Sequence, residues 1–579
     1  MRWDKREPSA QWVLLWGVAL LLCLSLFMGA EDLPLRDYRE SRFAQLGWEM
    51  IQGGDWLIPH LNGTPYLNKP PMVPWMVALC FELLGKEEIS ARVPSLIGTL
   101  GMAICVGLLV SGMAGPRYGI LGACLLLGSP GIQYMGRMLS ADVPSTFFMS
   151  ASLLAFVKGV TGGPKVVYPL GFAFSALSVM SKGFTGLIYP VGAFLIYLVM
   201  EKREKMREIP WGWSILVFLV IAAPWFFVAE LREPGFLQHH FLGQQLARVA
   251  SPEGSVPFVS MPRGELILAF LGFMGPLAFL LPWSVSSSVR REGKSLLWIF
   301  SILIIVSVLI SRGRNYTYLV PALPAVIALT ASGIARPGTP GWRIPASLLM
   351  VALSLASFAA AFLLPGQIED IHPLLGGEEV VARMRLSIAL VGVILVGASY
   401  LLAKGRLLGS SALMAAVMLP GGWMLCVVQE AMAPMESRKD LGVWISQNVP
   451  PSVPIVVADP SDTQFEGTGG WNFYSGRRIL MLRFQEREKI VAQAPRVPDW
   501  IISREELFEM LRSERAFLLA ATPKAIEMLD LPMPLGSPVG SDSKFQLWIL
   551  GTEARGRDPS MAPFQTGRMS SSSTFSQEG

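Results

Sequence analysis

The sequence predicts a mainly α-helical protein: a polytopic transmembrane helical bundle followed by a soluble α/β domain. Of its 579 residues, 52% are hydrophobic and only 16% are charged, whereas soluble domains carry about 25% charged residues. The mean hydropathy is +0.46. Apolar runs long enough to cross a bilayer recur as far as residue 430, and from about residue 435 the composition becomes that of a soluble domain.

The charge and cysteine content exclude several other classes of protein. The formal net charge of +5 is small for a chain of this length, so no nucleic-acid partner is expected. All five cysteines lie in apolar runs and no CxxC pair occurs. The sequence therefore suggests neither a disulfide framework nor a thiolate metal site.

The first apolar run, "WVLLWGVALLLCLSLFMG" (12–29), follows three basic residues, Arg2, Lys5 and Arg6. It is long enough to span about 30 Å of hydrocarbon. No convincing small-x-small cleavage site follows it, so we expect a retained signal anchor rather than a cleaved signal peptide.

Thirteen apolar runs are expected to span the membrane. The division between the fifth and sixth depends on Lys182, which interrupts a nearly continuous run. The runs are 12–29, 92–113, 118–136, 142–160, 167–181, 184–200, 211–229, 265–286, 296–311, 318–335, 344–364, 385–403 and 408–428.

The basic residues between these runs predict their orientation, because short cytoplasmic loops are enriched in lysine and arginine. With a cytoplasmic N-terminus, the basic stretches "EKREKMRE" (201–208), "RREGK" (290–294) and "KGR" (404–406) all fall on the cytoplasmic side. An odd number of spans then places the C-terminus outside. The long segments expected to face outward are 30–91, 230–264 and 365–384.

The last part of the chain alternates between strand and helix patterns. "VPIVVAD" (453–459) and "RAFLLAA" (515–521) are typical of buried strands, and "REELFEMLRSER" (504–515) is typical of an amphipathic helix. This alternation predicts a small α/β domain. The expected organisation is a membrane domain over 1–430, an α/β domain over 435–552 and a Ser-rich, disordered tail over 553–579.

Charged residues gather in the first outer segment, "LPLRDYRESRFAQLGWEMIQGGDW" (33–56). Asp37 and Glu40 stand there beside Arg36, Arg39 and Arg42. Such a cluster is not required in a connecting loop, whereas a site that binds a phosphate and a hydroxyl requires charged side chains of both signs.

Asp142 is a second candidate, at the outer end of the fourth expected span. A lysine or arginine near a span end commonly extends to the headgroups, but the short side chain of an aspartate cannot. Ionisable groups at membrane depth are costly and tend to be functional. Two carboxylate regions with several cations suit a reaction in which cations hold a lipid phosphate as a sugar leaves, while a carboxylate orients or deprotonates the acceptor.

A long stretch of the first outer segment resembles a known family. "ESRFAQLGWEMIQGGDWLIPHLNGTPYLNKPPMVPWMVALCFELLG" (40–85), followed by "ARVPSLIGTL" (91–100), resembles the first outer loop of the GT-C glycosyltransferases. The most similar branch contains the lipid A aminoarabinose transferases and the bacterial relatives of the protein O-mannosyltransferases. The similarity continues through Asp142, "SKGFTG" (181–186) and "YLVPALP" (318–324).

This resemblance implies an integral membrane glycosyltransferase of the bacterial cytoplasmic (inner) membrane. Its donor would be a sugar linked to a polyprenyl phosphate, its active site would face outward, and the anomeric carbon would be inverted. The acceptor could be a lipid A-like glycolipid, a protein or another glycan, and membrane lipids would be further partners. Two alternatives remain: a transporter or flippase, which would predict internal span repeats that the sequence lacks, and a non-catalytic binder of lipid-linked sugars.

The resemblance also implies site residues in the first outer loop. The family motif is Asp-Glu-x-Arg-[Tyr/Phe]-Ala, and Glu40, Arg42, Phe43 and Ala44 match it, but Arg39 stands at the aspartate position. Either Glu40 or Asp37 is expected to supply the catalytic carboxylate. A structural alternative is that these acids only form ion pairs with Arg39 and Arg42.

The remaining expected site residues lie in other outer segments. Asp142 matches the aspartate of the family's second outer loop and is expected to be catalytic. The expected ligands of the substrate and its phosphate are Lys69, Arg248, Arg42, Lys182 and Tyr318.

The same comparison bears on metal binding. In the aminoarabinose transferases a glutamate before the Lys-Pro pair and a histidine in a later loop resemble a zinc pair. Those positions hold Asn68 and Gln245 here, and amides are poor zinc ligands. We expect no cofactor and no tightly bound zinc; a weakly held divalent cation on the donor phosphate remains possible.

Overall fold

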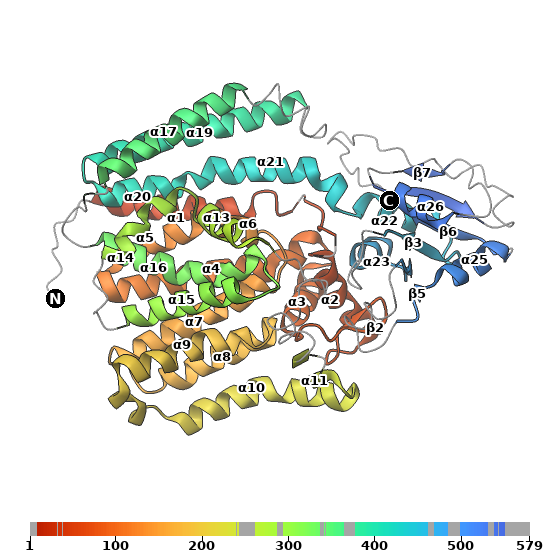
Figure 1. Cartoon of the computed structure of the whole chain (residues 1–579), viewed down its shortest axis with the longest axis horizontal. Coiled ribbons are helices and arrows are strands. Elements are labelled where there is room, and N and C mark those ends of the chain that lie inside the picture. Colours follow the sequence, from red (N-terminus) through yellow and green to blue (C-terminus); the bar gives the residue numbers. More distant parts are fainter. Residues whose placement is uncertain are drawn as a thin grey trace, which may run out of the picture.

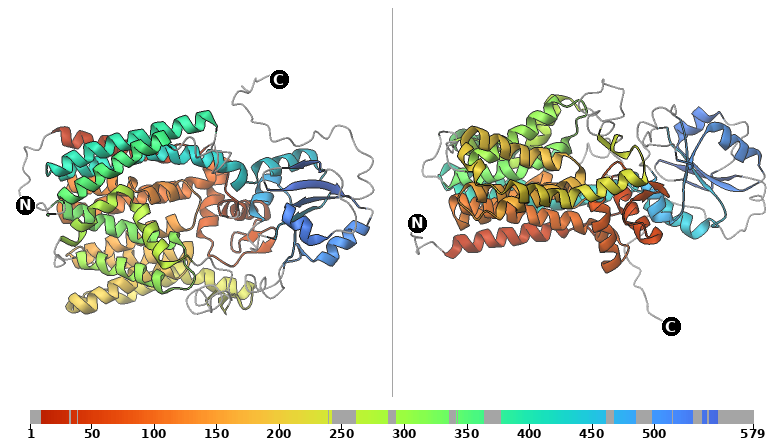
Figure 2. Two further views of the ribbon diagram at one scale, coloured as in Figure 1. Left: turned by 45° about the horizontal axis from the view of Figure 1, so that its top comes forward. Right: turned by 90° about the horizontal axis from the view of Figure 1, so that it is seen from below.

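The computed structural model places a helical bundle at one end of the molecule and an α/β domain at the other, with the first outer loop between them (Figures 1 and 2). Most of the described chain is helical. The structure describes residues 9–31, 33–37, 39–238, 240–241, 261–286, 293–335, 341, 343–363, 377–460, 468–484, 498–513, 515–530, 538–541 and 544–550.

Each of the thirteen predicted spans coincides with helical structure. Within the described residues, eight segments are long and apolar enough to cross a membrane, and shorter apolar helices accompany them. The bundle elements are α1 (Ser9–Phe27), α4 (Glu88–Ala114), α5 (Pro116–Leu127), α6 (Pro130–Gly136), α7 (Asp142–Val160), α8 (Val167–Lys182), α9 (Thr185–Glu201), α10 (Trp211–Arg232), α13 (Arg263–Met274), η3 (Gly275–Leu280), α14 (Leu281–Ser286), α15 (Lys294–Ile310), η4 (Tyr316–Ala322), α16 (Leu323–Ile334), α17 (Arg343–Leu363), α19 (Glu378–Ala403), α20 (Leu407–Ala416) and α21 (Met418–Glu436).

Glycine and proline interrupt or separate several of these spans. α5 ends before Gly128, where an added Cβ would lie 2.6 Å from the Ala415 Cα, and α6 restarts at Pro130. α8 ends at Lys182, and Gly183, with φ +111°, turns the chain into α9. Because few residues other than glycine adopt such a φ, the predicted division at Lys182 is confirmed.

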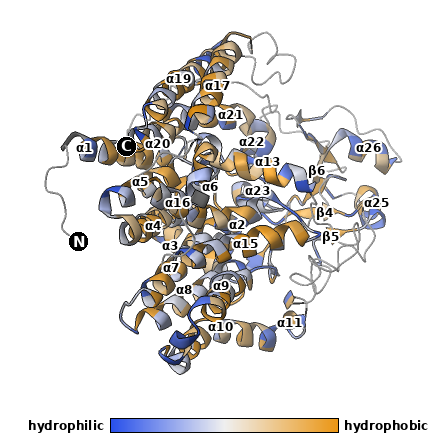
Figure 3. Cartoon of the chain, turned by 60° about the vertical axis from the view of Figure 1, so that its left-hand side comes forward, coloured by the Kyte–Doolittle hydropathy of each residue, from blue (hydrophilic) through white to orange (hydrophobic). Residues whose placement is uncertain are grey.

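Burial varies strongly across the bundle. In the segment formed by η4 and α16, 89% of the apolar window is buried, whereas in α17 only 22% is buried. Figure 3 shows apolar residues along most of the bundle helices. Exposed apolar side chains on a peripheral helix suit contact with lipid, and the buried α16 lies in the main apolar core.

The first outer loop folds on itself before the chain re-enters the bundle. It contains α2 (Ser41–Gly53), a short hairpin of β1 (His60–Leu61) and β2 (Thr64–Pro65), and α3 (Met72–Leu84). Asn62 and Gly63 form the hairpin turn with φ of +55° and +78°, as an Asn-Gly turn favours. The apolar helix α3, which was not among the predicted spans, packs against α2 and α4.

The C-terminal domain contains the predicted strands and helix. The strands expected at 453–459 and 515–521 are β3 and β6, and the helix expected at 504–515 is α25, which begins with a capping box between Ser503 and Glu506. The sheet order is β5-β4-β3-β6-β8-β7, parallel from β5 to β6 and antiparallel beyond. Its elements are α22 (Lys439–Asn448), β3 (Ile455–Ala458), α23 (Gly469–Ser475), β4 (Leu480–Leu482), β5 (Ile501–Ile502), α25 (Arg504–Arg512), β6 (Phe517–Ala521), α26 (Pro523–Leu529), β7 (Gly540–Ser541) and β8 (Gln546–Leu550).

Asn62 joins this domain to the hairpin of the first outer loop. Its Nδ2 donates to the Ile479 carbonyl at 2.8 Å, and its Oδ1 accepts from Asn472 Nδ2 at 2.7 Å and from Ile479 N–H at 3.0 Å. Trp500 Nε1 also donates to Thr64 Oγ1 at 2.9 Å. The α/β domain therefore packs directly on the loop that carries the candidate site residues.

Candidate functional site

The ends of three bundle elements bring together Asp142, Lys182 and Tyr318. Asp142 opens α7 and Lys182 closes α8, and their side chains form an ion pair. Lys182 Nζ also lies 5.0 Å from the centroid of the Tyr318 ring, in η4. The side chains of Lys182 and Asp142 are 13% and 17% exposed, so the pair is largely enclosed but accessible.

The Asp142–Lys182 pair is positioned by the ends of α7 and α8 and by the packing between these two helices. The N-terminus of a helix favours an anion and the C-terminus favours a cation, which suits Asp142 and Lys182 at their positions. Ser145 Oγ and Ser178 Oγ lie 2.9 Å apart and link α7 to α8. The two helices therefore hold the carboxylate and the ammonium side by side, although 40 positions separate them in the sequence.

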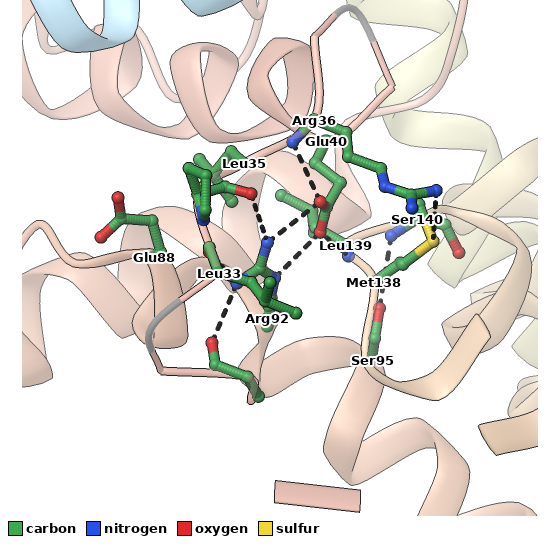
Figure 4. Close-up of polar contacts among 12 residues, drawn as sticks. Leu33, Leu35, Arg36, Glu40, Glu88, Arg92, Ser95, Met138, Leu139 and Ser140 are labelled. Atoms are coloured by element: carbon green, nitrogen blue, oxygen red, sulfur yellow. Dashed lines mark hydrogen bonds and ion pairs between the residues drawn. The ribbon is translucent and has the colours of Figure 1, made fainter. Parts of the chain in front are cut away.

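Glu40 occupies a different and fully buried position, with a side chain that is only 1% exposed. One carboxylate oxygen accepts from Arg92 Nε at 3.0 Å and from Leu139 N–H at 2.8 Å. The other accepts from Arg92 Nη2 and from Arg36 N–H, each at 3.0 Å (Figure 4). Burial alone would raise the pKa of Glu40, but the attraction of Arg92 and these hydrogen bonds outweigh it and hold the pKa below its ordinary value.

Arg92 extends this pair into a network that joins four parts of the chain. Its guanidinium also donates to the carbonyls of Ala30 at 2.9 Å, Leu33 at 2.5 Å and Pro34 at 3.0 Å. Leu139, which donates to Glu40, lies three residues before Asp142. The geometry of Glu40 thus favours positioning of the loop and of the segment that leads to Asp142, and its predicted catalytic role stays a prediction.

Asp37 lies at the junction with the C-terminal domain. Its Oδ2 is 3.1 Å from Arg438 Nε, and its N–H donates to the Glu436 carbonyl at 2.6 Å. Arg36 Nε is 2.8 Å from the Glu436 carboxylate. Asp37 and Glu40 therefore form ion pairs with distant arginines, Arg438 and Arg92.

Of the remaining predicted ligands, Arg42 and Lys69 lie in the first outer loop. The Arg42 guanidinium lies 4.8 Å from the Phe43 ring centroid and 5.8 Å from that of Tyr66. Lys69 is partly buried between the hairpin and α3. Arg248 and Gln245 lie outside the described residues.

Sequence reasoning missed three residues near these positions. Arg92 lies in the stretch "ARVPSLIGTL", whose resemblance to the family was the available signal. Tyr316 accepts a hydrogen bond from Arg39 Nη1 at 2.9 Å, and no pattern in the sequence predicted this contact. His240, which is fully buried, has its Nδ1 3.4 Å from the Leu67 carbonyl and packs against Phe236.

A small, partly open pocket lies between the first outer loop and α21. Three arginines and two glutamates line it, so its charged side chains balance to a formal +1. It borders the Glu40–Arg92 pair. Its polar lining includes Arg36, Glu40, Arg92, Arg137, Gln429 and Glu436.

Metal ligands do not gather in the part of the chain that the structure describes. Over those residues no group of three or more His, Cys, Asp or Glu could hold a metal ion. Asn68 is buried, 7% exposed, and offers an amide where the resembled enzymes have a glutamate. The chemistry of Asn68 therefore does not fit a zinc site.

Comparisons with known proteins agree with this architecture. Residues 68–227 match the family model of the dolichyl-phosphate-mannose-protein mannosyltransferases. An undecaprenyl phosphate-alpha-4-amino-4-deoxy-L-arabinose arabinosyl transferase of Shewanella sediminis is 27% identical over 318 residues, which cover 53% of this chain and 57% of that protein. One from Pseudomonas fluorescens is 28% identical over 325 residues, covering 53% and 58%. The matched region thus spans somewhat more than half the length of these relatives.

The fold has a solved counterpart. ArnT from Cupriavidus metallidurans, crystallised bound to undecaprenyl phosphate, superposes with a TM-score of 0.78 and 20% sequence identity, over 94% of this chain and 98% of that one. The resemblance and the fold class predicted from the sequence are therefore confirmed: the chain is a multi-pass membrane protein with the GT-C fold of ArnT, similar in sequence to the aminoarabinose transferases and to the dolichyl-phosphate-mannose-protein mannosyltransferase family.

Proposed function

We propose that this protein is an integral membrane glycosyltransferase that transfers a sugar from a polyprenyl-phosphate-linked donor to an acceptor on the outer face of the membrane. The observation that carries the proposal is the convergence of Asp142, Lys182 and Tyr318 at the outer ends of α7, α8 and η4. The names of the relatives and the undecaprenyl phosphate bound by ArnT support the class of donor.

The proposed reaction is a direct displacement with inversion at the anomeric carbon. An acceptor oxygen attacks the anomeric carbon while the bond from that carbon to the phosphate oxygen breaks. The acceptor proton passes to Asp142, and the electron pair of the broken bond leaves on the polyprenyl phosphate. Lys182 lies beside Asp142 and stabilises the charge that grows on the phosphate, together with Lys69, Arg42 and Arg248.

Tyr318 and the first-loop carboxylates have supporting roles in this proposal. The Tyr318 ring packs against Lys182 and orients its ammonium group. Glu40 holds Leu139 and thereby the segment before Asp142, while Asp37 ties the loop to Arg438.

We further propose that the N-terminus is cytoplasmic, that the α/β domain is extracytoplasmic, and that the bacterial cytoplasmic membrane holds the protein. The basic loops support this orientation. The protein would need no tightly bound zinc, since Asn68 supplies an amide. The acceptor would be a glycolipid, a protein or a glycan.

The purified protein, incubated with a radiolabelled sugar on polyprenyl phosphate and with membrane acceptors, tests this function. A transferase releases free polyprenyl phosphate and moves the label to an acceptor. A flippase in liposomes moves the labelled lipid between leaflets without cleaving it. A non-catalytic binder, favoured by Arg39 at the aspartate position and by the engaged lone pairs of Glu40, retains the lipid and releases nothing. Either of the last two results would refute the proposed function.

A further inference from the structure

Arg39 differs from the other charged residues of its segment in where it points. Arg36 pairs with Glu436, Asp37 with Arg438, and Glu40 with Arg92, all in the interior of the loop or at the domain junction. Arg39 is exposed, and its Nη1 instead donates to the Tyr316 hydroxyl at 2.9 Å. It therefore contacts η4.

η4 contacts both Arg39 and the lysine of the Asp142–Lys182 pair. Tyr316 and Tyr318 are two residues apart on this helix, where the rise is about 2 Å per residue. Tyr316 contacts Arg39, and the Tyr318 ring contacts Lys182. Asn315 caps the helix by accepting from Thr317 N–H at 3.0 Å, so the start of η4 is well defined.

We propose that Arg39 is a ligand of the donor phosphate, supplied by the first outer loop at the position where the resembled motif has an aspartate. The inference rests on the proposed function and adds a residue to its site. A guanidinium has only donors and stays protonated, so this position cannot act as a base. It can offer paired N–H donors and a positive charge to phosphate oxygens.

An arginine at position 39, where the resembled motif has an aspartate, changes the charge balance of the site. With Arg39 in the loop and Glu40 neutralised by Arg92, the loop presents a cation, not a carboxylate, towards η4. A donor phosphate between Arg39 and Lys182 would then be held from two sides, and Lys182 would be drawn from Asp142, which frees that carboxylate for the acceptor proton. Arg39 thus binds the phosphate that leaves, while Asp142 accepts the proton of the attacking hydroxyl.

Binding of undecaprenyl phosphate and of undecaprenol to the full-length protein in nanodiscs tests this role. We expect Arg39→Ala to weaken undecaprenyl phosphate binding about 10- to 100-fold, as removal of a hydrogen bond to a charged group does, and to leave undecaprenol binding unchanged. Arg39→Lys should give an intermediate loss, because it keeps the charge and loses the planar fork. The loss of undecaprenyl phosphate affinity in Arg39→Ala should be smaller at high salt.

Two control variants show whether Arg39 binds the phosphate or only holds the loop in place. Tyr316→Phe removes the hydroxyl that Arg39 contacts but keeps the ring against Phe273, and should retain most of the affinity. Arg232→Ala removes another exposed outer arginine, one paired with Asp55, and should change nothing. Equal losses in Arg39→Ala and Tyr316→Phe, or no loss in Arg39→Ala, would overturn the role of Arg39. If the unmodified protein did not distinguish the phosphate from the alcohol, the donor class itself, and hence the proposed function, would be wrong.

Discussion

At the scale of single residues, the three carboxylates predicted to be catalytic occupy three different environments. Asp142 is partly exposed beside Lys182, Asp37 lies at the domain junction, and Glu40 is enclosed with four hydrogen-bond donors on its two oxygens. A carboxylate whose lone pairs are already engaged is poorly suited to accept a proton from a substrate. This difference in environment supports our proposal that Asp142 accepts the acceptor proton and that Glu40 positions the loop.

Glu40→Gln should destabilise the protein strongly. It would leave Arg92, 2% exposed, as a buried cation without its carboxylate, and breaking a buried pair from one side typically costs about 3–5 kcal/mol. Thermal unfolding of the detergent-solubilised protein should show a large decrease in Tm. Glu379→Gln, which removes an exposed pair with Arg383, should have little effect. Similar Tm values for the two variants would contradict the structural role of Glu40.

The pH dependence of stability gives a second test at this residue. The pKa of Glu40 in the folded protein lies below its ordinary value, which is about 4.3. Its contribution to the free energy of unfolding is therefore complete above that ordinary value and is lost as the pH falls through the lower folded-state pKa. The unmodified protein should lose more stability than Glu40→Gln when the pH is lowered from 5 to 3. Parallel declines would show that Glu40 does not carry this dependence.

At the scale of elements, short turns and hairpins place the site residues. Gly183 ends α8 directly after Lys182, and the Asn62–Gly63 turn seats the β1–β2 hairpin on α23 and β4. Both depend on a positive φ. The positions of Lys182 and of the loop should therefore be sensitive to substitutions at these turns.

Gly183→Ala should lower both stability and activity. The backbone of Gly183, at φ 111° and ψ −161°, lies in a region that is essentially restricted to glycine and costs other residues about 1–3 kcal/mol. Relaxation of the turn would shift Lys182 away from Asp142. Gly212→Ala is the matched control, because Gly212 lies in α10 with no atom within 4 Å of an added Cβ, and alanine favours a helix. Tm and sugar transfer should fall in the first variant and stay near the starting values in the second; the reverse order would contradict the placement of Lys182 by this turn.

Asn62→Ala should loosen the α/β domain from the first outer loop. It would leave the Ile479 N–H and one N–H of the buried Asn472 amide without the Asn62 oxygen that accepts both. The other bond of that amide, to the Arg477 carbonyl, would stay. Each buried N–H left without a partner costs about 1–3 kcal/mol. Hydrogen exchange should increase in the hairpin and in α23. Asn448→Ala, which removes a bond to Trp444 within α22, should leave the hairpin as protected as before. Unchanged exchange in Asn62→Ala would show that the domain is held elsewhere.

At the scale of the whole molecule, hydrophobicity alone predicted the helical bundle, and strand and helix periodicity predicted the α/β domain. The resemblance pointed to Asp142, Lys182 and Tyr318, and the structure brings these three side chains together. The sequence could not predict that Glu40 pairs with Arg92, 52 positions away, or that Arg39 meets Tyr316, 277 positions away. Such pairs depend on how the loop folds over the bundle, and no local pattern encodes that path.

The orientation of the whole chain is open to a direct test. A phosphatase fused after Ser437 should be active, because the thirteen predicted spans starting from a basic cytoplasmic N-terminus place that residue outside. A reporter that works only in the cytoplasm should be inactive at the same position. Activity of the cytoplasmic reporter there would show that the span count is wrong.

The central claim is that Asp142 at the outer ends of the bundle helices carries out sugar transfer, and Asp142→Asn tests it most directly. The variant keeps the size of the side chain and removes its charge, so the protein should fold, insert and still bind undecaprenyl phosphate. Transfer of a labelled sugar from polyprenyl phosphate to the acceptor should fall by at least about 10²- to 10⁴-fold, the range expected for loss of a general base. The control Glu379→Gln should transfer at the rate of the unmodified protein. Transfer by Asp142→Asn at that same rate would contradict the assignment of this site.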